Sequence, residues 1–211
     1  MLYFNCQKDK ATEMMKNIRK IKENKMMKDV VKIAKVVTKI LEVFHWVAVV
    51  LMIAATVCSL TATDWVKYFV GFDAKECCGV ELSVYGFEII TPLKNGSVDM
   101  TVLFLFGIGA VMLLSLMAMV FRNINLIIKK SEDSTPFQAD NIRMLKEIGI
   151  YAIAIPVISL IMSVVCRVVL GIDAVETSVN VYGFSMGVII LCLTQFFVYG
   201  ARLEKDVEGL L

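Results

Sequence analysis

Four long stretches without charged side chains constrain this sequence more than any other feature. They cover about residues 43–63, 100–121, 148–170 and 184–201, and Arg167 is the one charged residue within them. A helix of about 20 apolar residues crosses the hydrocarbon core of a bilayer. With 58% hydrophobic and 20% charged residues, the chain of 211 residues also has too little polar surface for a soluble domain of that length. The sequence therefore predicts an all-α membrane protein, a four-transmembrane-helix bundle.

The distribution of lysine and arginine predicts how the chain is oriented. Eleven of these residues lie in positions 1–42, five in 122–147 and two in 202–211, against three in 64–99 and none in 171–183. Basic residues are enriched in the cytoplasmic loops of membrane proteins. We therefore expect a multi-pass protein of the cell membrane whose two termini are both cytoplasmic. Asn95 is expected outside, and Lys130 and Leu211 inside.

The segment 1–42 is predicted to be cytoplasmic, basic and amphipathic, and its residues 14–41 are predicted to form a helix that leads into the first span. Apolar residues recur at helical spacing in two stripes, Met14, Ile18 and Ile21, followed by Met27, Val30, Ala34, Val37 and Leu41. Many lysines lie between them. Such a helix binds the anionic inner leaflet of a bilayer well, and a protein partner is the alternative. Direct nucleic-acid binding is not expected, because no aromatic residues are interleaved with the basic ones.

The connection 122–147 is predicted to be a cytoplasmic helical hairpin. A turn is expected at residues 131–134, and the next helix is expected to start with Thr135 as N-cap, Pro136 at the first position and Gln138 completing a capping box. The tail 202–211 carries charge of the opposite sign. Partner binding is predicted at Arg122, Arg143, Lys146, Glu204 and Asp206, and the alternative is that hairpin and tail bind each other.

Two short motifs resemble a known family. Pro136-Phe137 is followed by Asn141, Arg143, Leu145, Ile148 and Gly149, and the tail reads YGARLEKDVEG from position 199. These segments are similar to the DUF2975 family of bacterial four-span membrane proteins. The resemblance implies a bacterial protein of unassigned function. It also implies a frequent genetic neighbour, a small helix-turn-helix DNA-binding regulator, as the cytoplasmic partner.

The outer segments 64–99 and 171–183 are predicted to form a small extracytoplasmic β cap. Residues 80–85 alternate apolar and polar side chains, and Asn95-Gly96 is a strong hairpin signal before Val98, Met100 and Val102. The tetrapeptide VYGF occurs at 84–87 and again at 181–184. This repeat suggests two related halves, with strands at Val80–Val84 and Val179–Val181 pairing in one sheet.

Cysteines are the most reactive groups predicted outside. Cys77 and Cys78 lie in the first outer segment, while Cys58 and Cys166 lie near the outer ends of two spans. Disulfides through Cys77 or Cys78 and free thiols are both open interpretations, because spacing alone does not rank the pairings.

Few polar groups lie inside the spans. His45, beside Trp46, is expected as an interfacial anchor or an intramembrane polar contact, and Arg167 and Gln195 are further candidates for such contacts. No catalytic set, metal-ligand cluster or cofactor motif is apparent in the sequence. The sequence therefore favours a regulatory or sensory membrane protein that couples an outer cap to a cytoplasmic partner. The alternatives are a self-protection protein that binds a toxic peptide or lipid, and a small oligomeric channel or transporter, for which a homo-oligomer is the expected state.

Overall fold

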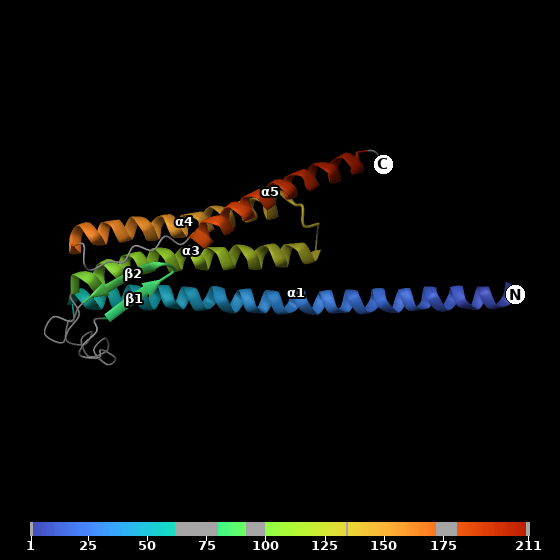
Figure 1. Cartoon of the computed structure of the whole chain (residues 1–211), viewed down its shortest axis with the longest axis horizontal. Helices are drawn as coiled ribbons and strands as arrows, with labels where there is room; N and C mark the ends of the chain where they lie inside the picture. The colour runs from blue at the N-terminus through green and yellow to red at the C-terminus, as the bar shows by residue number, and fades with distance from the viewer. Residues whose placement is uncertain (1, 62–79, 92–99, 134, 172–180, 210–211) are drawn as a thin grey trace.

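A computed structural model describes residues 2–61, 80–91, 100–133, 135–171 and 181–209. Figure 1 shows long helices and one β-hairpin, in the order α1 Leu2–Thr61, β1 Val80–Val84, β2 Phe87–Thr91, α3 Met100–Asp133, α4 Ala139–Leu170 and α5 Val181–Glu208. Four helices are long and apolar enough to cross a membrane, over Lys25–Cys58, Met100–Glu132, Ala139–Leu170 and Val181–Val207. The prediction of a mostly helical chain with four helices that could cross a membrane is confirmed.

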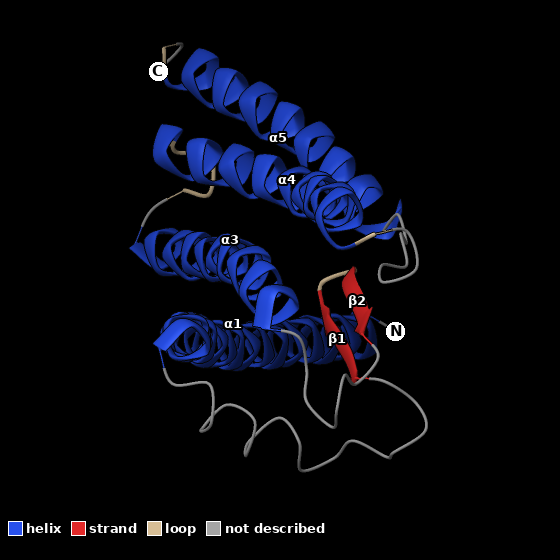
Figure 2. Cartoon of the chain, turned by 90° about the vertical axis from the view of Figure 1, so that its left-hand side faces the viewer, coloured by secondary structure: helices blue, strands red, loops and turns tan. Residues whose placement is uncertain are grey.

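The helices stand side by side in a curved row, in the order α1, α3, α4, α5. Figure 2, viewed along the helices, shows this row open on one side, with the β-hairpin on that side. Small residues allow neighbours to approach closely, since a Cβ on Gly107 would lie 2.0 Å from Thr56 of α1 and one on Gly149 would lie 2.6 Å from Leu191 of α5. Small residues at contacts are typical of membrane helices. In the described part of the chain, the four predicted helices are therefore arranged as an open row.

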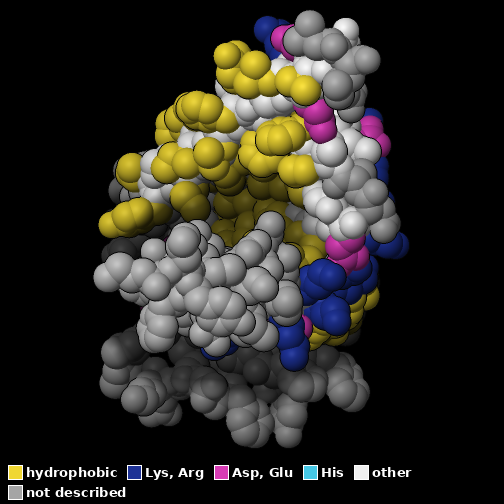
Figure 3. All heavy atoms as spheres, turned by 90° about the vertical axis from the view of Figure 1, so that its right-hand side faces the viewer, with side chains coloured by type: hydrophobic (Ala, Val, Ile, Leu, Met, Phe, Trp, Pro, Cys, Tyr) yellow, Lys and Arg dark blue, Asp and Glu magenta, His cyan; other side chains and the backbone are white. Residues whose placement is uncertain are grey.

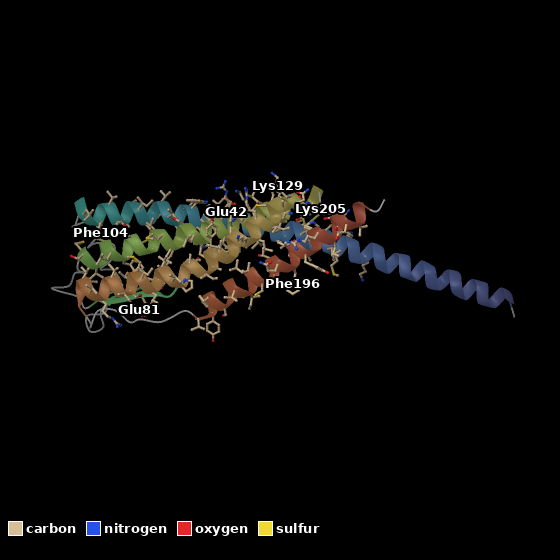
Figure 4. All side chains as sticks on the ribbon, turned by 90° about the horizontal axis from the view of Figure 1, so that it is seen from above. Glu42, Glu81, Phe104, Lys129, Phe196 and Lys205 are labelled. Atoms are coloured by element: carbon tan, nitrogen blue, oxygen red, sulfur yellow. The ribbon has the colours of Figure 1, made fainter. Side chains whose placement is uncertain are left out.

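Helix α1 is one continuous helix of 60 residues. At 1.5 Å per residue it is about 90 Å long, roughly three times the hydrocarbon thickness of a bilayer. Figures 1 and 4 show its N-terminal part running well beyond the other helices. The expected helix before the first span is present, and it continues back to Leu2 in line with the span.

The start of α4 differs from the prediction. Helix α3 continues to Asp133, so residues 131–133 are helical, and α4 begins at Ala139 with Gln138 as an extended N-cap that makes no side-chain cap bond. The residues expected to start the helix have partners on α5 instead. The Thr135 hydroxyl donates to Glu204 at 3.3 Å, and the ring of Phe137 lies 5.6 Å from that of Phe197. These long-range contacts hold the segment before α4 in a non-helical conformation.

The β-hairpin turns at Tyr85-Gly86. Strands β1 and β2 pair antiparallel, with Val84 opposite Phe87 and Leu82 opposite Ile89. The expected turn at 95–96 lies outside the described residues. Met100 and Val102, expected in a strand after that turn, belong to α3, so that part of the prediction is wrong.

The expected strand in the second outer segment is also not seen. Val181 is the first residue of α5, and positions 179 and 180 lie outside the described residues. The sheet of the described residues has two strands, β1 and β2. The proposed likeness of two span–strand–span halves therefore fails at Val181, because the second VYGF starts a helix.

The hairpin packs along the helices, whereas a cap would cover their ends. Phe87 and Ile89 are fully buried in one cluster with residues of α3 and α4, among them Phe106, Leu113, Ile155 and Cys166. Phe87 stacks on Phe106 with ring centroids 5.6 Å apart, and a Cβ on Gly109 would lie 2.5 Å from the Phe87 ring. Glu81 and Ser83, on the opposite face of the hairpin, are exposed. The buried face of the hairpin thus packs against the open side of the helix row.

Candidate functional site

The hairpin turn has a conformation that needs support from its surroundings. Tyr85 has φ 49° and Gly86 has φ 83°. Positive φ at both central residues is typical of the two-residue turns that match the twist of β-strands, and asparagine and glycine are the usual residues there. A bulky side chain at positive φ is uncommon and costs conformational energy. The contacts of the Tyr85 side chain offset the conformational cost of its positive φ.

Tyr85 reaches His45 on α1. The Tyr85 hydroxyl is hydrogen-bonded to Nε2 of His45, and Nδ1 of His45 lies 2.7 Å from the carbonyl oxygen of Leu41. A carbonyl only accepts, so Nδ1 carries the proton, and Nε2 of the neutral ring is then an acceptor. The Tyr85 hydroxyl therefore donates to Nε2. His45 is 5% exposed, and its ring centroid lies 5.1 Å from that of Phe121 on α3.

The Tyr85–His45 contact lies deep between the helices. His45 is 16 residues from the end of α1 at Thr61, which is about 24 Å along the helix axis, against a hydrocarbon thickness of about 30 Å. Non-helical backbone at such depth is tolerated only where protein buries it or water reaches it. The hairpin tip thus extends along most of the predicted span 43–63 and ends near the N-terminal boundary of that span.

Polar contacts begin immediately beyond this point. Asn123 of α3 donates to Glu147 of α4 at 2.9 Å. Two residues later, Asn125 donates to the carbonyl oxygen of Lys35 at 2.9 Å and to the hydroxyl of Thr38 at 3.1 Å, both on α1. A single stretch of α3, residues 121–125, therefore contacts His45, α4 and α1 in turn.

Ion pairs continue this network at the end of α3. The ammonium of Lys35 lies 2.6 Å from Glu132, and that of Lys130 lies 2.5 Å from Asp140 at the start of α4. The hydrogen bond from Lys130 holds the pKa of the Asp140 carboxyl below its usual value. These pairs are exposed, so each adds little to stability alone. Together they join α1, α3 and α4 at this end of the row.

The predicted partner-binding residues remain on the surface but do not form one site. Arg122, Lys146 and Asp206 are exposed, and Arg143 lies 3.7 Å from Glu147 on its own helix. Glu204 contacts the α3–α4 turn through Thr135 at 3.3 Å. The tail and the turn are thus joined by this hydroxyl, while Arg143 and Lys146 leave an accessible basic surface on α4.

The other predicted residues lie apart from the Tyr85–His45 contact. Arg167 and Gln195 are exposed on the apolar surfaces of α4 and α5. Cys166 is buried and free, Cys58 is exposed and free, and the two do not form a disulfide. Cys77 and Cys78 lie outside the described residues. Within the described ranges, no group of three or more His, Cys, Asp or Glu side chains is arranged to hold a metal ion.

Sequence reasoning singled out His45 but missed Tyr85. The two residues are 40 positions apart, and the strand pattern placed Tyr85 in an outer cap. A Tyr-Gly pair at the end of an alternating segment is a weak turn signal beside Asn-Gly. Only the docking of the hairpin into the helix row reveals the pair.

Comparisons of the chain with protein-family models, with curated proteins and with solved structures gave no match. The similarity to the DUF2975 family stays a prediction from its two short motifs.

Proposed function

We propose that this protein is a membrane signalling protein in which the β-hairpin couples the outer segments to the cytoplasmic ends of α1, α3 and α4. The observation that carries the proposal is the hydrogen bond between Tyr85 and His45, about 24 Å from the outer end of α1. A structural connection between outer ends of two spans would need no such depth. A ligand or force that moves the hairpin shifts Tyr85 against His45, and His45 packs on Phe121.

The proposed path continues through contacts with two discrete partners. From Phe121 it reaches Asn123 and Asn125, which bind α4 and α1 respectively. Asn123 is buried and Asn125 is half-buried, and breaking either contact is costly because it leaves an amide shielded from water without its partner. Movement at the tip therefore changes how α1 and α3 sit together at the cytoplasmic end.

The output surface in this proposal is the basic face of α4 with the α3–α4 turn. Arg143 and Lys146 are exposed there, while most of the spans are apolar. A small DNA-binding regulator of the helix-turn-helix type is the partner that the family resemblance implies, in a bacterial membrane with both termini cytoplasmic. Figure 1 has the N- and C-terminal ends and the α3–α4 turn at the same end of the helix row, as this orientation requires.

Coupling is tested by spin labels on the cytoplasmic end. Labels at Lys28→Cys on α1 and Lys129→Cys on α3, in a background without the native cysteines, report the separation of the two helices. We expect Tyr85→Phe to broaden or shift the distance distribution, and Tyr182→Phe, the matching position of the second VYGF, to leave it unchanged. Superimposable distributions for all three proteins would refute the coupling.

The orientation and the output surface have separate tests. A cysteine at position 95 should react with an impermeant maleimide in intact cells, and a cysteine at position 130 only after permeabilisation. Arg143→Glu with Lys146→Glu should remove a soluble partner from the protein purified out of native membranes, at unchanged membrane abundance. Lys32→Glu, on α1, is the matched control. Unchanged recruitment would show that the α3–α4 turn is only a connector.

A further inference from the structure

Helix α1 carries an apolar seam on the side turned away from α3. Ten exposed positions follow one another at alternating spacings of four and three residues: Met26, Val30, Ile33, Val37, Ile40, Phe44, Val47, Leu51, Ala54 and Cys58. The first eight expose between 48% and 65% of their surface, with Val37 at 48% and Phe44 at 65%. A repeat of 3.5 residues is the spacing at which two helices wind around each other. We call these ten positions the α1 seam.

The α1 seam is separate from the contact with α3. Side chains of α1 that face α3 include Lys35, Thr38, His45 and Thr56, which bind or approach residues of α3 or the hairpin. The neighbouring helices of the row thus cover one side of α1 only. Figure 2 shows α1 as the edge of the row, with its other side uncovered among the described residues.

The cytoplasmic half of the seam lies beyond the reach of lipid. Measured along the axis of α1 from Thr61, a length of about 30 Å, the hydrocarbon thickness of a bilayer, ends near Glu42. Lys35 and Lys39 lie beyond that point and form ion pairs with Glu132 and Glu42. Met26, Val30, Ile33 and Val37 therefore expose apolar surface at the depth of headgroups and water. Acyl chains cover the seam from Phe44 onward but not these four side chains.

The charges of α1 leave the seam free for another helix. Lys28, Lys32, Lys35 and Lys39 each lie two residues after a seam position, which is about 200° around the helix axis. These lysines therefore lie on the opposite side, and two copies meeting along the seam would not bring them face to face.

We propose that the α1 seam binds the α1 seam of a second copy of this chain, in a parallel pair that runs from the cytoplasm through the membrane. A partner must present an apolar face both outside the bilayer and within it. Its boundary between the two parts must fall at the same residue as in α1. A parallel copy related by a two-fold axis along the membrane normal meets this condition by construction. Helix α5 of a neighbour is antiparallel to α1 in the same membrane. It also ends at Glu208, whereas α1 continues far beyond the row (Figure 4). Helix α5 of a neighbour therefore does not match the whole α1 seam.

The native Cys58 tests the outer end of the pair. With Cys58 as the only cysteine, oxidation with copper phenanthroline in native membranes should shift most of the chain to a disulfide-linked band of twice its mass. The control places the only cysteine at Ile53, which is 46% exposed and lies on the flank beside α3. That variant should stay at the monomer mass. Equal cross-linking at both positions, or none at Cys58, overturns the proposal.

The cytoplasmic half is tested in the same membranes. Single cysteines at Ile33 and Ile40 should be joined to a second copy by a short bis-maleimide, and cysteines at Lys32 and Lys39 should not. Ile33→Glu with Val37→Glu should abolish the Cys58 cross-link, whereas Lys32→Glu with Lys39→Glu should retain it. Cross-linking of position 33 to a protein of another mass would overturn the proposal in favour of a different partner.

Discussion

The tetrapeptide VYGF occurs twice in this chain and adopts two unrelated structures. At 84–87 it forms the end of β1, the hairpin turn and the start of β2, and Phe87 is fully buried. At 181–184 it forms the first turn of α5, where Tyr182 is 86% and Phe184 49% exposed. Identical local sequence thus gives a buried turn in one place and an exposed helix end in the other.

The flanking residues explain the difference. The first copy joins two five-residue segments, VELSV and FEIIT, and shares Val84 with the first and Phe87 with the second. Apolar residues stand at alternate positions of the first segment, which suits a strand with one buried face. The second copy is followed by a long apolar run that, within a bilayer, must pair its backbone groups inside a helix. The packing of Phe87 against Phe106 then fixes the hairpin, whereas Phe184 has no comparable burial. Each residue of the first VYGF can therefore be compared with the residue at the same place in the second.

The largest difference is expected between the two phenylalanines. Phe87→Ala removes a fully buried ring and should lower the free energy of unfolding by about 3–5 kcal/mol. Phe184→Ala, at a half-exposed position, should cost less than about 1 kcal/mol because no enclosed cavity forms. Unfolding of the purified protein in mixed micelles measures both. Similar losses would mean that the hairpin is not docked between the helices.

The glycines should differ next. Gly86 has φ 83°, so Gly86→Ala forces a side chain into the left-handed region and should cost about 1–2 kcal/mol. Gly183 lies in the first turn of α5, where alanine is the better helix former by up to about 1 kcal/mol. We therefore expect opposite signs for Gly86→Ala and Gly183→Ala in the same unfolding measurement. If both variants changed the free energy of unfolding in the same direction, the turn at Tyr85-Gly86 would be contradicted.

An effect of similar size is expected from the tyrosine hydroxyls. Tyr85→Phe leaves Nε2 of the buried His45 without its donor, which should cost about 1–3 kcal/mol. Tyr182→Phe removes a hydroxyl from a side chain that is 86% exposed and should leave stability unchanged. The difference between the two losses of stability measures what the hydrogen bond between Tyr85 and His45 contributes. Equal stability of both variants would contradict the hydrogen bond.

The subtlest difference is spectroscopic. His45 is the single histidine of the chain, so its ring nitrogens can be followed without assignment. We expect a neutral ring with the proton on Nδ1, bound to the Leu41 carbonyl, and an Nε2 resonance that moves in Tyr85→Phe but not in Tyr182→Phe. Nitrogen NMR of the labelled protein gives this directly. A proton on Nε2 would reverse the direction of the Tyr85 bond.

The sequence by itself determined the number and the type of the long helices. A bilayer demands about 20 apolar residues per span and internal pairing of every backbone group, so length and composition are enough to recognise them. The continuity of the N-terminal helix with the first span and the strand at Val80–Val84 were also predictable, because both depend on local periodicity.

Only the tertiary structure decided where the irregular segments go. The turn formed at Tyr85-Gly86 because Phe87 and Ile89 find a core there, and α4 begins at Ala139 because Thr135 and Phe137 bind α5. His45 finds its partner 40 residues away. Turn and cap signals are worth about 1 kcal/mol each, whereas burying an aromatic ring or satisfying a buried polar group is worth as much or more. Long-range contacts therefore overrule local signals wherever the two compete.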